Sequence, residues 1–310
     1  MKNILVLGAG LVGKTIAIDL CKNYNVTSAD VNETALAQLR NQHPIKTVVA
    51  DLSISKNVHD LVQPFDLIIG AVPGFMGFKT LKTIIEAGKN VVDISFFPED
   101  PFDLDLLATK HNVTAIVDCG VAPGMCNVLA GYHNTKMKLE SYECMVGGLP
   151  MVREWPFEYK AVFSPIDVIE EYTRPARYIE DGKLVVREAL SDAEYINFEN
   201  IGTLESFNTD GLRTLAFTLP RVPNMKEKTL RYPGHIALMR VFRETGFFNK
   251  EKIPVNGVEV SPLEFTSKLL FPKWKLQDGE EDFTIMQVVL KGKDSSGKSL
   301  KHVYTLHDKF

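Results

Sequence analysis

The residues best suited to chemistry begin with a glycine-rich turn near the start of the chain. Gly8, Gly10 and Gly13 form the pattern G-x-G-x-x-G directly after an apolar run, and Asp30 ends the next apolar run. In such a turn the first glycine permits a tight bend, the second lets the backbone approach a pyrophosphate, and the third allows close packing of helix on strand. The N–H groups at the start of that helix face the phosphates. The pattern therefore predicts a dinucleotide site formed by Gly8, Gly10, Leu11, Val12, Gly13 and Asp30.

Asp30 also bears on which dinucleotide binds. Its carboxylate can accept hydrogen bonds from both ribose hydroxyls, whereas a 2′-phosphate would meet repulsion. Val31 and Asn32 follow, so no arginine stands beside Asp30 to neutralise such a phosphate. We therefore expect NAD in preference to NADP. The alternatives are a glycine turn that binds nothing and an S-adenosylmethionine site, but the third glycine together with Asp30 suits a dinucleotide better.

A parallel sheet is predicted to hold these residues together. Strands are expected over Asn3–Leu7, over the run that closes on Asp30, and over Lys46–Ala50, Asp66–Gly70, Asn90–Asp93 and Val113–Val117. Helices are expected between them over Thr15–Leu20, Glu33–Arg40, Ile54–Val62, Phe78–Ala87 and Leu104–Lys110. This alternation predicts an α/β fold, a Rossmann-type doubly wound parallel sheet with the strand order 3-2-1-4-5-6.

In such a sheet, ligands bind beyond the carboxyl ends of the strands, so the residues that follow each strand are candidates for the site. Asp51 and Leu52 are expected to border the adenine, although Asp51 can equally be a turn residue. Further contacts with the cofactor are expected from Ala71, Val72, Pro73, Val121 and Pro123.

The second half of the chain has a different pattern. Lys138–Val146 is typical of a strand, and two hairpins are expected, one joining Arg177–Glu180 to Lys183–Arg187 and one joining Phe283–Leu290 to Leu300–Leu306. Pro233–Glu244 and Pro262–Leu270 have the spacing of amphipathic helices. We therefore expect an α+β domain with a mixed or antiparallel sheet. The predicted domains are residues 1–126 and 127–310, with the boundary near Asn127 inside a helix.

The composition limits the kinds of partner that the protein is expected to bind. The net charge of −4 and the lack of a basic run argue against nucleic acid, and no apolar stretch is long enough for a bilayer span. The four cysteines have neither paired nor metal-ligand spacing, so we expect free thiols, no metal and a cytoplasmic protein. Cys126 is expected in the first turn of a helix, which can lower its pKa, but a small buried side chain is the simpler interpretation.

Several short motifs occur in a fixed order along most of the chain, from Gly8 to about His235. They are Asp93-Ile-Ser-Phe, Asp118 to Asn127, Gly147-Gly148-Leu149-Pro150, Phe163-Ser164 with Glu171-Tyr172 and Pro175, Glu205 with Thr209-Asp210-Gly211, and Thr229-Leu-Arg231-Tyr232-Pro233-Gly234-His235. In these motifs the chain resembles the saccharopine dehydrogenase-like family, in particular its lysine 6-dehydrogenase branch.

The chain departs from that family at three places. Members that act on saccharopine carry an aspartate where this chain has Ala122 and a cysteine where it has Val146, so both differences point away from saccharopine. Relatives also continue past the last strand, whereas this chain stops at Phe310. Either that segment is absent or the sequence is cut there, which bears on domain closure.

The resemblance implies an NAD-dependent enzyme that oxidises the side-chain amine of an amino acid, with L-lysine as the expected substrate, and a homodimer formed through the sheet of the second domain. Saccharopine and carboxynorspermidine dehydrogenases are the alternatives within this class. A non-catalytic dinucleotide-binding protein is the alternative outside it.

Oxidation of an amine requires groups that deprotonate an ammonium and later activate water. Asp93 and Asp118 end adjacent strands and can bind the ammonium, or they can cap turns. His235 is a candidate for proton transfer and Arg231 for bidentate capture of a carboxylate, in a cleft between the domains; a surface arginine and a capping histidine are the alternative. Substrate contacts are predicted for Arg231, Glu154, Tyr159 and Asn127, and Trp155 is interpreted as core in preference to a pocket wall.

Overall fold

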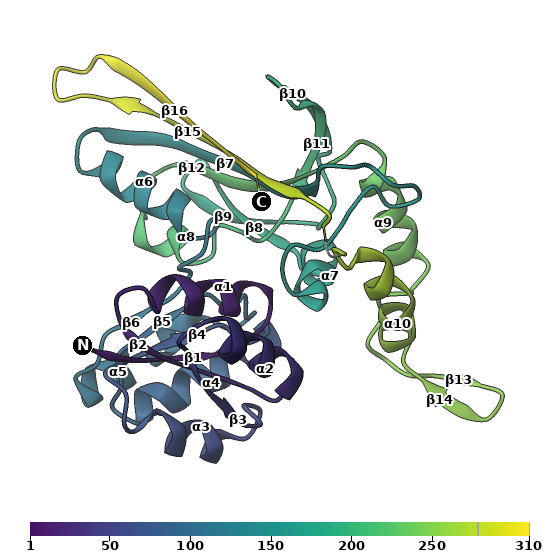
Figure 1. The fold of residues 1–310 in the computed structure, drawn as a ribbon. Helices are drawn as coiled ribbons and strands as arrows, with labels where there is room; N and C mark the ends of the chain where they lie inside the picture. The colour runs from purple at the N-terminus through teal and green to yellow at the C-terminus, as the bar shows by residue number, and fades with distance from the viewer. Residues whose placement is uncertain (278, 310) are drawn as a thin grey trace. The chain divides into compact units, whose positions relative to one another are not determined.

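The computed structural model describes residues 1–277 and 279–309 (Figure 1). The chain divides into two compact units, Met1–Gly120 (unit 1) and Val121–Phe310 (unit 2). The division precedes helix α6 (Met125–Asn134), whereas the predicted boundary at residues 126 and 127 lies inside that helix. Within the described residues, no helix combines the length and the apolar character that crossing a membrane requires.

Unit 1 is built on a parallel sheet. Its strands are β1 (Asn3–Leu7), β2 (Asn25–Asp30), β3 (Lys46–Val49), β4 (Leu67–Gly70), β5 (Val91–Asp93) and β6 (Ala115–Ile116). They lie in the order β3-β2-β1-β4-β5-β6, which confirms the predicted order. Leu5 and Leu7 of β1 belong to one apolar cluster while Ile4 and Val6 belong to another, so the central strand is buried on both faces, as a doubly wound sheet requires.

Helices alternate with these strands. They are α1 (Leu11–Leu20), α2 (Glu33–Gln42), α3 (Ser55–Val62), α4 (Gly74–Glu86), the 3₁₀ helix η1 (Pro101–Leu104) and α5 (Asp105–His111). Helix α4 begins at Gly74, earlier than the predicted Phe78, because Gly74 and Gly77 are poor helix formers that packing retains in the helix. A Cβ at Gly77 would lie 2.6 Å from the Ser95 Cβ, so the helix can approach β5 and its following loop only with glycine there.

Unit 2 is built on a mixed sheet. Its strands are β7 (Lys138–Pro150), β8 (Ala176–Glu180), β9 (Lys183–Arg187), β10 (Glu194–Phe198), β11 (Gly202–Asn208), β12 (Asn224–Arg231), β15 (Asp282–Lys293) and β16 (Ser299–Lys309). The order is β10-β11-β12-β7-β15-β16, with β8 joining β12 and β9 joining β8. Strand β12 runs parallel to β7, and the other pairs are antiparallel. The predicted mixed sheet is therefore confirmed.

Strand β7 is longer than the predicted Lys138–Val146 because it continues through Gly147 and Gly148. A Cβ at Gly147 would lie 2.6 Å from the Leu230 carbonyl oxygen, and one at Gly148 would lie 2.4 Å from the Val162 side chain. Glycine is unfavourable for an isolated strand, but here it allows the neighbouring segments to approach. Packing thus overrides the local preference that ended the predicted strand.

The two predicted hairpins of unit 2 are present. β8 and β9 are joined by Asp181 and Gly182, whose φ values of 48° and 75° are those of a type I′ turn. β15 and β16 pair along their whole length. The helices are α6, α7 (Pro165–Thr173), α8 (Leu215–Thr218), α9 (His235–Glu244) and α10 (Pro262–Trp274), and a separate hairpin consists of β13 (Ile253–Val255) and β14 (Val258–Val260).

Candidate functional site

The three glycines of the turn after β1 have different surroundings. Gly8 has a φ of 111°, and a Cβ there would lie 2.4 Å from the Ala71 carbonyl oxygen. A Cβ at Gly13 would lie 2.2 Å from the Gly8 carbonyl oxygen. A Cβ at Gly10, in contrast, would meet no described atom within 4 Å. Gly8 and Gly13 therefore serve the fold, while Gly10 leaves the backbone accessible, which is the arrangement that a pyrophosphate needs.

Helix α1 begins at this turn with Gly10 as its N-cap. No described side chain caps it, and its first turn carries no acidic residue. The first N–H groups of a helix have no partner within the helix, and the helix dipole favours an anion there. Leu11 and Val12, the first two residues of α1, are exposed. The start of α1 can therefore hold the phosphates of a dinucleotide.

Asp30 lies at the end of β2, directly beside the turn. Its Oδ2 accepts a hydrogen bond from the Ala9 N–H (2.7 Å), and its Oδ1 accepts one from the Asn32 N–H (2.8 Å). These bonds fix the carboxylate, and each oxygen keeps a further lone pair for a ribose hydroxyl. The residues present therefore fit a dinucleotide, since glycine turn, helix start and carboxylate are all at one edge of one sheet.

The residues after β3 and β4 have mainly structural contacts. Asp51 accepts hydrogen bonds from the Ser53 N–H (2.9 Å) and hydroxyl (2.6 Å), and these bonds lower its pKa. These contacts are those of a turn residue, which was the alternative to an adenine contact for Asp51. Leu52 and Val72 are buried in an apolar cluster of unit 1, and Pro73 is the N-cap of α4. Ala71 contacts the turn through its backbone, since its N–H donates to the Leu7 carbonyl (2.9 Å).

Asp93 ends β5, and Asp118 lies two residues beyond the end of the neighbouring strand β6. The backbone N–H of Cys119 donates to the Asp93 carbonyl (3.2 Å), which links the ends of β5 and β6. Asp93 is buried, and its Oδ1 accepts from the Ser95 N–H (2.8 Å). A Cβ at Gly70 would lie 1.9 Å from Asp93 Oδ2, so the glycine that ends β4 makes room for this carboxylate. Asp118 is also buried and has a φ of 54°, a conformation that aspartate tolerates better than most residues.

Neither Gly70 nor Ser95 was assigned a role from the sequence, although Ser95 lies in the motif that begins at Asp93. The signal for Ser95 was present, because an aspartate followed two residues later by a serine is a common turn pattern. The signal for Gly70 was absent, because only the paired strands show that its position faces Asp93.

The loop from Val121 to Gly124 leads into α6 at the start of unit 2. Val121 is exposed and Pro123 is half-buried. Asn127 lies in the first turn of α6, where its Oδ1 accepts a hydrogen bond from the Cys126 thiol (3.1 Å). The predicted roles of these three residues in binding cofactor or substrate stay predictions.

Arg231, at the end of β12, is the centre of a buried network in unit 2. Its side chain is 2% exposed and forms an ion pair with Glu171 (Nη2 to Oε2, 2.6 Å). Its Nε donates to the Tyr172 hydroxyl (3.1 Å), its Nη1 donates to the Leu230 carbonyl (3.0 Å), and the guanidinium lies over the Tyr159 ring at 4.5 Å from the centroid. The guanidinium thus already holds a carboxylate, that of Glu171.

His235, at the start of α9, completes this network. Its Nδ1 lies 2.8 Å from the Phe157 carbonyl, which can only accept, so Nδ1 carries the proton and Nε2 accepts from the Tyr172 hydroxyl (2.9 Å). Burial and the nearby Arg231 lower the pKa of His235 to about 3. In this arrangement His235 is neutral near pH 7 and does not titrate there, which argues against the predicted role in proton transfer.

The remaining predicted residues of unit 2 differ in how far their side chains are exposed. Tyr159 is buried, and burial raises its pKa. Glu154 is mostly exposed and lies 3.2 Å from Lys160 Nζ. The interpretation of Trp155 as core is wrong, because this side chain is 88% exposed. The buried tryptophan is Trp274 of α10, which packs edge-on against Tyr159 and Tyr172.

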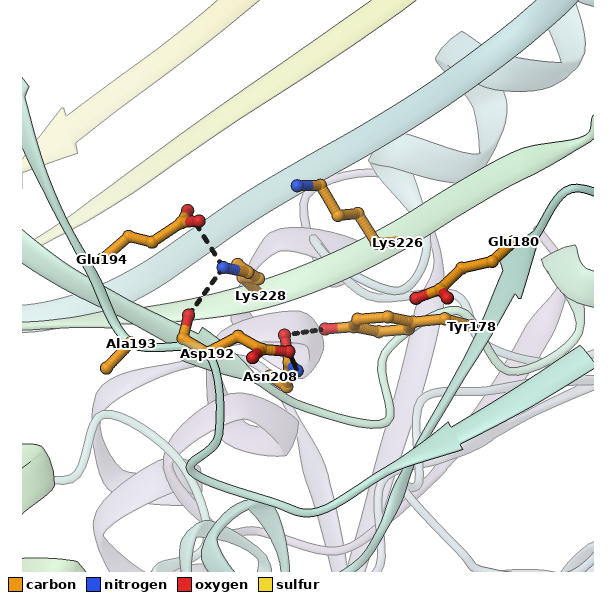
Figure 2. A pocket seen from close by; sticks show the side chains of 8 residues that line it. All are labelled: Tyr178, Glu180, Asp192, Ala193, Glu194, Asn208, Lys226 and Lys228. Atoms are coloured by element: carbon orange, nitrogen blue, oxygen red, sulfur yellow. Dashed lines mark hydrogen bonds and ion pairs between the residues drawn. The ribbon is translucent and has the colours of Figure 1, made fainter.

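Unit 2 also contains a polar pocket of about 290 Å³ (Figure 2). It is lined by Tyr178, Glu180, Asp192, Ala193, Glu194, Asn208, Lys226 and Lys228. Lys228 Nζ donates to the Asp192 carbonyl (2.8 Å) and pairs with Glu194 (3.0 Å), while Asn208 Nδ2 donates to Asp192 Oδ2 (2.7 Å). Because these polar groups satisfy one another, we assign the pocket no role in the function proposed below.

Comparison with known proteins covers both units. Residues 4–116 match the saccharopine dehydrogenase NADP binding domain, and residues 120–309 match the saccharopine dehydrogenase C-terminal domain. The mitochondrial alpha-aminoadipic semialdehyde synthase of Rattus norvegicus is 26% identical over 287 residues, which are 86% of this chain and 31% of that protein. The saccharopine dehydrogenase [NADP(+), L-glutamate-forming] of Saccharomyces cerevisiae is 23% identical over 282 residues, which are 86% of this chain and 63% of that protein. The chain thus spans less than two thirds of the length of these relatives.

Solved structures agree on the fold. The apo saccharopine dehydrogenase (L-Glu forming) from Saccharomyces cerevisiae aligns with a TM-score of 0.75 at 18% identity, over 100% of this chain and 86% of that one. The homospermidine synthase from Legionella pneumophila in complex with NAD aligns with a TM-score of 0.64 at 12% identity, over 99% of this chain and 77% of that one. With a dinucleotide-binding unit and a second unit that both match, this chain belongs to the saccharopine dehydrogenase family.

Proposed function

We propose that this chain is an NAD-dependent oxidoreductase that oxidises the side-chain amine of an amino acid, with L-lysine as its substrate. The observation that carries the proposal is the edge of the unit 1 sheet. There an accessible glycine turn and an uncapped helix start lie beside Asp30, and the buried carboxylates of Asp93 and Asp118 follow two neighbouring strands.

Each group at this edge has a distinct task in the proposed reaction. The backbone at Gly10 and the N–H groups of Leu11 and Val12 hold the pyrophosphate, and Asp30 holds the adenosine ribose. A bound nicotinamide supplies the hydride acceptor. Asp93 and Asp118 hold the substrate ammonium and take its proton, since an amine must lose its proton before its carbon can give up hydride.

The preference for NAD rests on Asp30 and its neighbours. The carboxylate is fixed by two backbone N–H groups. Ala29, Val31 and Asn32 adjoin it in the sequence, so no cation lies next to Asp30 along the chain. A 2′-phosphate would therefore meet a fixed negative charge. The names of two relatives specify NADP(+). The proposed preference of this chain for NAD is therefore best tested by comparing the dissociation constants of NAD and NADP directly.

The preference for lysine over saccharopine rests on Ala122 and Val146. Both side chains pack against the apolar cluster of unit 2 that contains Leu139, Tyr142 and Met286. The family resemblance implies an aspartate and a cysteine at these two positions in the members that act on saccharopine. Apolar residues there remove two polar contacts that the larger, more highly charged saccharopine can use.

A substrate panel tests the proposal. Purified protein is incubated with NAD or NADP and with L-lysine, L-ornithine, L-saccharopine or a carboxylated polyamine, and formation of the reduced cofactor is followed. We expect the highest kcat/KM with L-lysine and NAD. Turnover of saccharopine alone would assign the chain to the saccharopine-type activity. Tight NAD binding with no turnover of any amine would support the non-catalytic alternative and contradict the proposal.

A further inference from the structure

Three side chains with metal-binding atoms meet in the core of unit 2. They are Cys126 of α6, Cys144 of β7 and Glu227 of β12, and their ligand atoms all lie within 4.8 Å of one another. All three residues are buried, Cys126 and Cys144 completely. These residues are far apart in the sequence, so their spacing alone does not indicate a site. The fold brings them together.

The sheet explains the juxtaposition. β12 runs parallel to β7, and Glu227 is the direct partner of Cys144 in the register of this pair. Side chains of paired residues project from the same face of a sheet. Helix α6 immediately precedes β7 in the chain, and Cys126 in its first turn belongs to the same apolar cluster as Cys144. The strand register and the helix therefore direct two sulfurs and a carboxylate to one point.

Tyr142 provides an independent observation. It lies two residues before Cys144 on β7, so its side chain projects from the same face. It is 1% exposed, and among the described residues its hydroxyl has no hydrogen-bond partner of good geometry. A buried hydroxyl without an acceptor is costly, and a thiolate would be an acceptor for it.

The two thiols lie together in the core of unit 2. Both belong to the same apolar cluster, and neither is exposed. A bound cation would take both as thiolates, with release of their protons, because metal binding requires thiolates.

We propose that Cys126, Cys144 and Glu227 bind a divalent zinc ion that joins α6, β7 and β12. Two thiolates and a carboxylate are ligands that zinc favours, and a hard cation such as magnesium would select oxygens only. Tetrahedral Zn–S bonds of about 2.3 Å and Zn–O bonds of about 2.0–2.2 Å separate ligand atoms by about 3.3–3.8 Å. The cluster, within 4.8 Å, is only slightly wider than this.

Two further groups suit the proposed site. Asn127 Oδ1 lies 3.1 Å from Cys126 Sγ and now accepts its proton. When the thiol is deprotonated, this oxygen loses its donor and lies beside the proposed site. The Tyr142 hydroxyl donates to a thiolate from outside the ligand set, a type of contact that orients metal ligands. The site is proposed as structural, because Cys126, Cys144 and Glu227 are all buried.

Metal analysis of the full chain tests the proposal. The protein is produced with zinc supplied, dialysed without a strong chelator, and analysed by inductively coupled plasma mass spectrometry. We expect about one zinc per chain, falling at least about tenfold in Cys126→Ser, Cys144→Ser and Glu227→Gln. Cys21→Ser and Cys119→Ser are the matched controls and should keep the zinc, because these cysteines lie outside the cluster.

A second measurement covers the possibility that the cluster variants fold poorly. Cobalt(II) is exchanged into the wild-type protein, and we expect an absorption band from thiolate-to-cobalt charge transfer that zinc abolishes. Wild-type protein that contains no zinc and shows no such band would overturn the proposal. So would an intact mass lower by the two hydrogens of a disulfide, since the thiols would then be joined to each other. Zinc retained in both cysteine variants would also overturn it.

Discussion

The glycine turn of unit 1 and the Arg231 network of unit 2 are held in place by different kinds of contact. The turn uses backbone N–H groups and a single carboxylate, all from residues 8–30. The network joins Glu171 and Tyr172 of α7, Arg231 of β12 and His235 of α9 by one ion pair and by hydrogen bonds between side chains that are largely buried. The first is accessible and receptive to an anion. The second is satisfied internally, which favours a structural role over ligand binding.

Removing Arg231 should have the largest effect. Arg231→Ala leaves the Glu171 carboxylate buried without its partner, and the Tyr172 hydroxyl loses a donor. Loss of one partner of a buried ion pair costs about 3–5 kcal/mol. We expect the free energy of unfolding in urea to fall by that amount, while the NAD affinity of the folded protein stays unchanged.

The matched control for Arg231→Ala is Arg187→Ala in the β8–β9 hairpin. Arg187 also pairs with a glutamate, Glu180, at 2.6 Å, but this pair is exposed. Its loss should leave the unfolding free energy nearly unchanged, because solvent screens exposed pairs. A stable Arg231→Ala protein with a greatly reduced kcat/KM would contradict the structural role and restore the prediction that Arg231 holds a substrate carboxylate.

The pH dependence of stability should report on His235. Its pKa is about 3 in the folded protein and 6.5 in the unfolded chain, so below pH 6.5 the unfolded state takes up a proton that the folded state refuses. The stability contributed by neutral His235 is therefore complete above pH 6.5 and falls as the pH drops towards 3. At pH 5, about 1.5 units below the unfolded value, the loss is about 2 kcal/mol.

Urea unfolding at pH 7.5 and pH 5 measures this effect. The wild type should lose about 2 kcal/mol more than His235→Gln between the two pH values. His59→Gln is the control, because His59 is half-exposed on α3 and should leave the wild-type pH dependence in place. Identical pH dependence in the wild type and His235→Gln would show that His235 is not buried as a neutral side chain.

Substitutions in the glycine turn should distinguish a glycine that stabilises the fold from one that binds the cofactor. Gly13→Ala places a Cβ 2.2 Å from the Gly8 carbonyl oxygen, and this overpacking outweighs the better helix propensity of alanine. We expect a net loss of about 1–2 kcal/mol in the free energy of unfolding. Gly10→Ala meets no described atom and should unfold like the wild type, yet weaken NAD in calorimetry. Equal stability losses in both variants would remove the distinction between the two glycines.

The same contrast explains how much of the fold was predictable. The six strands of unit 1 and their order follow from local patterns, since apolar runs, helical spacing and glycine turns are all written within short segments. The hairpin at Asp181-Gly182 was predictable for the same reason. The predicted bounds of helices and strands were wrong where contacts between segments distant in the sequence determine the structure. Gly77 and Gly147 extend α4 and β7 because of contacts with Ser95 and Leu230.

The candidate sites show the same limit. Gly8, Gly13 and Asp30 could be identified from their spacing, because two consecutive strands and the helix between them position them. The sequence contains Glu171 and Arg231 as separate motifs, but only α7 packed beside β12 reveals that they pair. Trp155 was misassigned because a loop has no periodicity that would show its exposure. The Cys126, Cys144 and Glu227 cluster depends entirely on strand register.

The smallest expected effect concerns cofactor choice at Asp30. In Asp30→Asn combined with Val31→Arg, the asparagine oxygen can still accept one of the two backbone hydrogen bonds, the fixed charge is removed, and an arginine at an exposed position can pair with a 2′-phosphate. We expect the ratio of the NADP and NAD dissociation constants to shift towards NADP by about three- to tenfold, or about 0.7–1.4 kcal/mol, measured by calorimetry. Asp51→Asn is the control, since Asp51 interacts with its own turn and should leave the ratio unchanged. If the wild type already binds NADP more tightly than NAD, Asp30 does not select the cofactor. Binding of a dinucleotide at the turn then depends on the backbone N–H groups alone.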